Sequence, residues 1–124
     1  MASGSLSDQV ISQWLTDLAA RAAYVSLHTA LPDFALPDNS EVPGQAGYSR
    51  SASAWSLQSN RSIANTVAMQ FNLALETNIA ALGLREDLTG GILLGYAVPP
   101  PGFPIVVPQT GLLTIPIGEV VFAL

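Results

Sequence analysis

The sequence predicts a mainly β protein, an antiparallel β-sandwich of about seven or eight short strands with one N-terminal α-helix. Helical spacing of apolar residues occurs only near the N-terminus, short alternating or continuous apolar runs follow it, and turn residues separate these runs at regular intervals. With 124 residues the chain is expected to form one domain. Within it, residues 1–22 are predicted to be a helical arm and residues 23–124 the β-sandwich body.

Residues 6–22 carry the helical pattern. Ser5 or Ser7 can cap the first turn, and Asp8 suits the positive end of the helix dipole. The stripe either packs on the protein's own core, which is the simpler interpretation, or docks on a neighbouring subunit. Its apolar members, spaced three and four residues apart, are Leu6, Val10, Ile11, Trp14, Leu15, Leu18 and Ala22.

The body is expected to contain strands in which the apolar period is two. The first alternates like a half-buried strand, the second is rich in Ser and Ala as at an exposed edge, and two nearly continuous apolar runs suit strands buried on both faces. A hairpin turn is predicted at residues 87–91 and another turn at 116–118. The predicted strands are residues 24–28, 48–57, 66–71, 79–84, 92–98, 110–115 and 119–124.

Two connections are unusual. Residues 31–47 hold three prolines and two glycines and exceed the usual loop length, which indicates a loop that is functional or lies on a partner. Residues 99–104 are proline-rich and are predicted to be a stiff, extended linker.

Scarcity of charge is the main feature of the composition. Charged residues make up 10% of the chain, against about 25% in ordinary soluble domains. Apolar residues reach 49% and the mean hydropathy is +0.40. Large exposed apolar patches usually mark partner surfaces, so the protein is expected to work within an assembly. The alternative is a tendency to aggregate, which the net charge of −5 offsets only modestly.

Several classes of function are excluded by what the chain lacks. It has no lysine, and its four arginines are widely spaced, so no basic stripe can bind nucleic acid. Prolines interrupt the most apolar region, so no membrane span is expected, and residues 1–7 do not resemble a signal peptide. The absence of cysteine removes disulfides and thiol catalysis and fits synthesis in a cytoplasm.

No catalytic, cofactor or metal site is predicted. His28 is the only histidine, and without cysteine it cannot build a typical zinc site, so it is expected to make ordinary hydrogen bonds at a strand end. Residues 47–51 come nearest to a Gly-x-Ser-x-Gly nucleophile elbow but fail at the last position. Asp33, Asp38 and Glu41 could hold calcium, but their spacing is not that of a calcium loop. A solvated acidic loop is preferred, and ion binding by residues 31–47 stays open.

Motifs along most of the chain resemble a family of small tailed-phage structural proteins, described as capsid decoration (cement) or tail-fibre-like proteins. The likeness runs from about residue 6 to residue 124. The motifs are Tyr24-Val-x-Leu-His-Thr29, Asn39-Ser-Glu-Val-x-Gly44, Gly47-Tyr-x-Arg50, Ile63-x-Asn65, Val67-x-x-x-Phe71, Ala80-x-x-Gly83-Leu84 and Leu88-Thr-Gly-Gly-x-Leu-Leu-Gly-x-Ala97.

The resemblance implies a non-catalytic role on the capsid exterior of a virion assembled in a host cytoplasm. There the protein would bind the major capsid protein, stabilise its lattice and form small homo-oligomers, with a trimer favoured. The first alternative is a tail-fibre or tail-tip component with the same fold. The second is a sandwich-type carbohydrate-binding module, which typically needs a row of exposed aromatic side chains, whereas the nine aromatics here do not cluster.

Five residues are candidates for structural or interface roles. Glu41 and Arg50 lie in the shared motifs and flank one loop, so a bidentate ion pair between them is expected to clamp its ends; the alternative is two unconnected surface charges. Trp14, Leu18 and Trp55 are candidate interface residues, since tryptophan dominates many binding hot spots. Trp14 fits core packing equally well, whereas Trp55 lies in a Ser- and Ala-rich run and favours a contact role.

Overall fold

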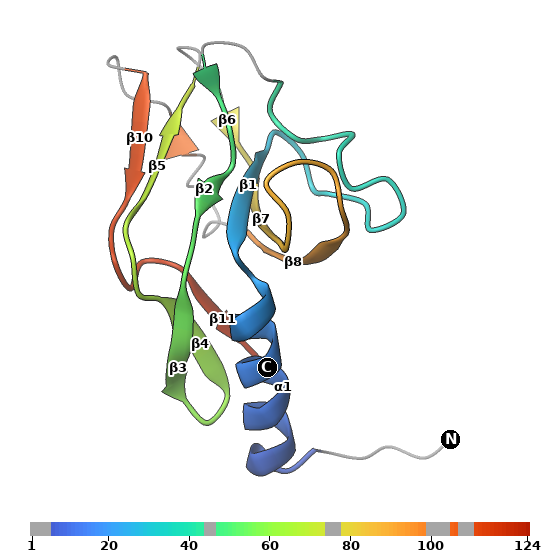
Figure 1. The fold of residues 1–124 in the computed structure, drawn as a ribbon, viewed down its shortest axis with the longest axis vertical. Helices are drawn as coiled ribbons and strands as arrows, with labels where there is room; N and C mark the ends of the chain where they lie inside the picture. Colours follow the sequence, from blue (N-terminus) through green and yellow to red (C-terminus); the bar gives the residue numbers. More distant parts are fainter. Residues whose placement is uncertain (1–5, 44–46, 74–77, 99–104, 107–110) are drawn as a thin grey trace.

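The computed structural model describes residues 6–43, 47–73, 78–98, 105–106 and 111–124 (Figure 1). It confirms the predicted class, a mainly β protein with antiparallel pairing and one helix before the strands. The predicted linker at residues 99–104 lies outside these ranges, as do residues 44–46 of the long loop. The elements are α1 (Asp8–Arg21), β1 (Tyr24–His28), β2 (Ser51–Ala52), β3 (Trp55–Ser59), β4 (Ser62–Asn65), β5 (Met69–Asn72), β6 (Asn78–Ile79), β7 (Ala81–Arg85), β8 (Leu93–Ala97), β9 (Ile105–Val106), β10 (Leu112–Ile115) and β11 (Val121–Ala123).

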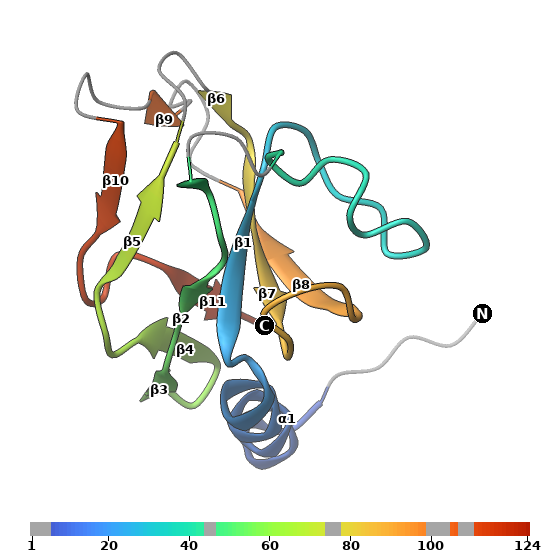
Figure 2. The same ribbon diagram turned by 45° about the horizontal axis from the view of Figure 1, so that its top comes forward.

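The strands are more numerous and shorter than predicted. Within the described ranges there are eleven: residues 48–57 give β2 and β3, residues 79–84 overlap both β6 and β7, and β4 and β9 lie outside the predicted strands. They form four antiparallel sheets, with strand orders β2-β1-β7-β8, β10-β5, β11-β4-β3 and β6-β9. In both ribbon views β5 and β10 lie on one side of the molecule and β7 and β8 on the other (Figures 1 and 2).

The helix packs on the protein's own core. Ser7 is its N-cap and accepts a hydrogen bond from the backbone N–H of Val10 at 3.3 Å, as the sequence predicted for Ser5 or Ser7. Ile11 and Leu15 are buried, and Leu18 packs against the same cluster. The helix contacts β3 and β4 and covers one end of the body (Figure 1). Burial of the stripe therefore anchors α1 to the body.

Strand β1 differs from the half-buried strand that was expected. Residues 25–28 are all buried, including the polar Ser26 and His28, which are both 0% exposed. The strand lies inside the four-stranded sheet, between β2 and β7. Beyond β1, the chain folds back so that the Val42 N–H donates to the carbonyl of Leu27 and the Thr29 N–H to that of Ser40. This return pairs with the end of β1 along its edge, where Glu41 forms an antiparallel bridge with His28.

The two C-terminal strands do not pair with each other. The predicted turn at residues 116–118 is present, with Gly118 at φ 81°, but β10 pairs with β5 and β11 pairs with β4. The predicted hairpin at residues 87–91 does form: β7 and β8 are antiparallel neighbours, and Gly90 and Gly91 have φ of 61° and 73°. Both positive φ values suit glycine and permit the tight connection.

Candidate functional site

The most unusual part of the described structure is an ionic cluster of two buried arginines, Arg50 and Arg85, with the partly buried Glu41 and the exposed Asp38. Glu41 and Arg50 form the bidentate pair that the sequence suggested: Nε donates to Oε2 and Nη2 to Oε1, each at 2.9 Å. The Arg50 side chain is 3% exposed and that of Glu41 13%. These two residues are therefore not independent surface charges.

Arg85, at the end of β7, is the second cation of the cluster and was not singled out from the sequence. It is fully buried. Its Nε donates to the hydroxyl of Ser26 at 3.1 Å, its Nη2 to the carbonyl of Pro37 at 2.9 Å, and its Nη1 lies 2.9 Å from Asp38 Oδ1. One available signal was that an arginine ends an otherwise apolar strand run in a chain with few charges.

Both guanidinium groups also bind the turn between β7 and β8. Arg50 Nη1 donates to the carbonyls of Asp87 at 2.9 Å and Gly90 at 2.8 Å. Arg85 Nη1 contacts the carbonyl of Gly90 at 3.5 Å. The cluster therefore does more than clamp the ends of the long loop. It fastens residues 31–43 onto the β7–β8 hairpin, and both segments lie on the same side of the molecule (Figure 2).

The cluster holds two positive and two negative side chains, so its formal charge is balanced. Burial alone raises the pKa of Glu41, but hydrogen bonds from Arg50 and Tyr48 outweigh it and hold this pKa below its ordinary value. The hydrogen bond with Glu41 in turn raises the pKa of Arg50. Tyr48 donates to Glu41 at 2.7 Å and accepts from the Leu27 N–H, and burial raises its pKa. Glu41 is thus an ionised, partly buried acceptor.

His28 makes the ordinary hydrogen bonds that were predicted for it. Its Nε2 lies 2.8 Å from Ser26 Oγ and its Nδ1 2.9 Å from Ser40 Oγ. Ser26 already accepts from Arg85, so its own proton is available to Nε2, which leaves the ring proton on Nδ1. Burial, together with the charge of Arg85, lowers the pKa of His28 from 6.5 to about 4. The imidazole is therefore neutral at pH 7.

This serine–histidine contact is not arranged to act on a substrate, because neither side chain is exposed. The backbone of Gly83 packs against the pair so closely that a Cβ atom there would lie 2.5 Å from Ser26 Oγ and 2.8 Å from His28 Nε2. Polar atoms of buried side chains within the described ranges all have hydrogen-bond partners. The arrangement is that of a satisfied structural network.

The sequence favoured a solvated acidic loop, but two of its three carboxylates are engaged in ion pairs. Asp38 and Glu41 bind the two arginines, so the prediction is wrong for Glu41, while Asp33 is exposed and accepts from the backbone N–H of Ala35. No group of three or more histidine and carboxylate side chains in the described part of the chain could hold a metal ion. The two arginines take the carboxylates that a cation would need.

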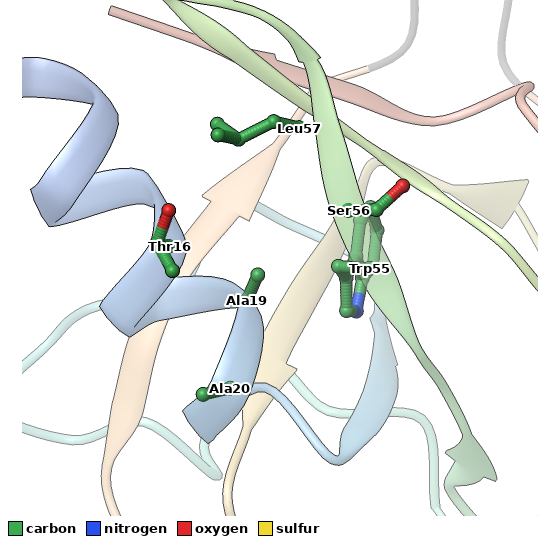
Figure 3. Close-up of a pocket in the computed structure, with 6 residues that line it drawn as sticks. All are labelled: Thr16, Ala19, Ala20, Trp55, Ser56 and Leu57. Atoms are coloured by element: carbon green, nitrogen blue, oxygen red, sulfur yellow. The ribbon is translucent and has the colours of Figure 1, made fainter.

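Of the other sequence candidates, Trp55 lines a shallow apolar groove between α1 and β3, whereas Trp14 and Leu18 of α1 are not part of its lining (Figure 3). Trp55 forms part of its wall but is only 8% exposed and meets Phe122 edge-on, with ring centroids 5.6 Å apart. Trp14 is instead 55% exposed. Trp55, for which a contact role was favoured, is thus buried, and Trp14, for which core packing was equally plausible, is exposed. The groove has a volume of about 390 Å³ and is lined by Thr16, Ala19, Ala20, Trp55, Ser56 and Leu57.

A second set of exposed apolar side chains belongs to the two segments that the ionic cluster joins. We call it the loop–hairpin face and define it by Leu31, Phe34 and Leu36 of the long loop and Leu88, Ile92, Tyr96 and Val98 of the β7–β8 hairpin. Apart from Tyr96, which is half-buried, each of these side chains is at least half exposed. Phe34 and Tyr96 connect the two segments, with ring centroids 5.7 Å apart.

The remaining arginines are paired as well. Arg21 binds Glu86, with Nε donating to Oε1 at 2.7 Å, and Arg61 Nε donates to Asp8 at 2.8 Å. All four arginines of the chain thus have carboxylate partners within it, and the sequence holds no lysine. This agrees with the expectation that the protein does not bind nucleic acid, which stays a prediction.

Comparison with known protein families identifies a match that covers most of the chain. The model of the family described as "Podophage GP4 fiber I protein gp80" matches residues 2–121. Neither the curated proteins nor the solved structures contain a match. No helix in the described ranges has the length and apolar character needed to cross a bilayer.

Proposed function

Because the chain belongs to the Podophage GP4 fiber I protein gp80 family, a family of phage virion structural proteins, we propose that it is a structural component of a tail fibre. The observation that carries the proposal is the extent of the match, which spans residues 2–121 of 124. The description of the family favours the tail-fibre alternative over the capsid-decoration role that the resemblance first implied.

The chemistry of the described residues supports a structural role. The buried polar groups are engaged with one another, and the Ser26–His28 contact is closed to solvent. The surface exposes apolar side chains, among them those of the loop–hairpin face, which suit contacts within an assembly better than the capture of a charged small molecule. A repeated virion contact gains strength from many copies, so modest apolar surfaces can suffice.

Capsid decoration remains the second candidate because its physical requirements are similar. The scarcity of charge and the exposed apolar side chains suit contacts with the major capsid protein as well as contacts within a fibre. A homo-oligomer, with a trimer favoured, belongs to both proposals. Its mass in solution can be measured by light scattering.

Copy number separates the two candidates. Quantitative mass spectrometry of purified virions, with the major capsid protein as internal standard, measures copies per particle. A small number, together with antibody labelling at the tail in electron micrographs, is the result expected for a fibre component. Hundreds of copies with labelling over the head would overturn the fibre proposal in favour of decoration. Absence of the protein from purified virions would contradict both.

A further inference from the structure

We propose that the loop–hairpin face is the docking surface for a different virion protein, whose contact region is apolar and bordered by lysine or arginine. The inference rests on the proposed function only in placing the protein in a virion. The face, its stiffness and its charge are properties of the described residues.

The face has the apolar character of a contact region. Six aliphatic or aromatic side chains on two adjoining segments are at least half exposed, in a chain that has many buried positions for such residues. Exposed apolar side chains gathered on adjoining segments often mark a binding site. The Phe34–Tyr96 contact keeps the loop and the hairpin together as one surface.

The two segments are already held in place without a partner. Arg85 binds the carbonyl of Pro37 in the loop and that of Gly90 in the hairpin, and Arg50 binds Glu41 of the loop and the carbonyls of Asp87 and Gly90. Each guanidinium therefore ties loop to hairpin from beneath. A surface that is ordered before binding loses less conformational entropy on association, which raises affinity. We assign this structural role, ordering the face before a partner binds, to the ionic cluster.

Charge determines the kind of partner. Asp33 and Asp87, on the two segments of the face, are exposed and have no ion-pair partner among the described residues. The two arginines beneath the face are buried and paired. A partner that carries lysine or arginine at the border would complement these carboxylates. A second copy would not, because its arginines all have carboxylate partners in its own chain and it has no lysine.

The lack of lysine makes a specific test possible. A carbodiimide joins a carboxylate to an amine without a spacer, and the only amine that this chain can offer is its N-terminus. In intact virions, products of Asp33 or Asp87 with a lysine must therefore contain another protein. A second probe is a photo-reactive phenylalanine analogue at position 34. The matched control carries it at Ile117, which is 66% exposed at the turn between β10 and β11.

The proposal expects carbodiimide products of Asp33 or Asp87 with a lysine of another virion protein, and photoproducts with the same protein from position 34 that exceed those from position 117 at least tenfold. Photoproducts from position 34 with a second copy would overturn the choice of partner. Equal or stronger labelling from position 117, or no product from position 34 in virions that contain the protein, would overturn the docking surface. Failure to find the protein in virions contradicts the proposed function instead.

Discussion

Replacing Glu41 by glutamine tests the buried ionic cluster most directly, because the amide keeps the shape of the carboxylate and removes its charge. In the wild-type protein Glu41 accepts two hydrogen bonds from Arg50 and one from Tyr48. With glutamine, Asp38 is the one carboxylate of the cluster left to balance Arg50 and Arg85, and its side chain is 56% exposed and thus screened by water. The variant therefore leaves a buried positive charge uncompensated.

The expected loss is large. Removing one partner of a buried ion pair costs about 3–5 kcal/mol, because the other charge stays desolvated. For a domain of this size the loss corresponds to a fall in Tm of roughly 10–20 °C. Arg50→Gln should cost a similar amount. The double variant should cost about 2 kcal/mol less than the sum of the two, because neither charge is then left without the other.

Urea unfolding followed by tryptophan fluorescence measures these free energies, since Trp55 is buried and reports on the core. Asp17→Asn is the matched control: this carboxylate is 71% exposed, 3.9 Å from Arg21, and its loss should change stability by less than about 0.5 kcal/mol. The reasoning fails if Glu41→Gln is as mild as the control. Purely additive effects in the double variant would contradict the direct pairing.

Three further predictions concern single positions. Folding lowers the pKa of His28 from 6.5 to about 4, so the stability linked to its neutral form is fully present above pH 6.5 and is lost as the pH falls towards 4. His28 contributes at most about 1.4 kcal/mol per pH unit to the slope of the unfolding free energy against pH. His28→Gln should remove this contribution in urea unfolding measured between about pH 4.5 and 6.5. Gly83→Ala should destabilise the protein by about 1–3 kcal/mol, because the new Cβ overlaps the serine–histidine contact beside it. Ser7→Ala should cost about 1 kcal/mol through loss of the N-cap, measured by urea unfolding.

Controls and contrary outcomes differ among the three. Equal pH slopes for wild type and His28→Gln would show that the histidine is not the titrating group. Gly95→Ala is the control for Gly83→Ala, because nothing lies within 4 Å of a Cβ built there. If both alanines are tolerated equally, the close packing at Gly83 is wrong. If Ser7→Ala is as stable as wild type, the cap at Ser7 does not hold the helix.

The helix and several strands could be read from the sequence because their signals are local. The apolar stripe of α1 repeats over four turns with a capping serine before it, and the β7–β8 hairpin is marked by two adjacent glycines. The division into small sheets could not be read in this way. Whether β10 pairs with β11 or with β5 depends on the packing of distant segments. An alternating pattern predicts a strand but does not identify its partner.

Only the Glu41–Arg50 pair of the ionic cluster could be predicted from the sequence. Glu41 and Arg50 were connected because they flank one loop, and the structure brings them together. Ser26 and His28 occupied alternate positions of a strand, where a polar residue normally faces solvent, so their burial gave no local signal. Arg85 lies 44 residues from Glu41 along the chain (85 − 41), and only the fold brings the two together. Buried polar networks depend on tertiary contacts, which local sequence patterns do not reveal.

The pairing of β11 with β4 has a consequence for synthesis. The Val120 N–H bonds to the side chain of Asn65 across 55 positions of sequence, and β10 joins β5 over a comparable separation. Contacts of such high order slow folding, because a long segment must be ordered before they form. During translation, β4 and β5 are synthesised before their partners β11 and β10, so each has an unpaired edge until the C-terminal strands are made. Such edges are prone to pair with other chains, so a host chaperone that covers them would raise the yield of assembled protein.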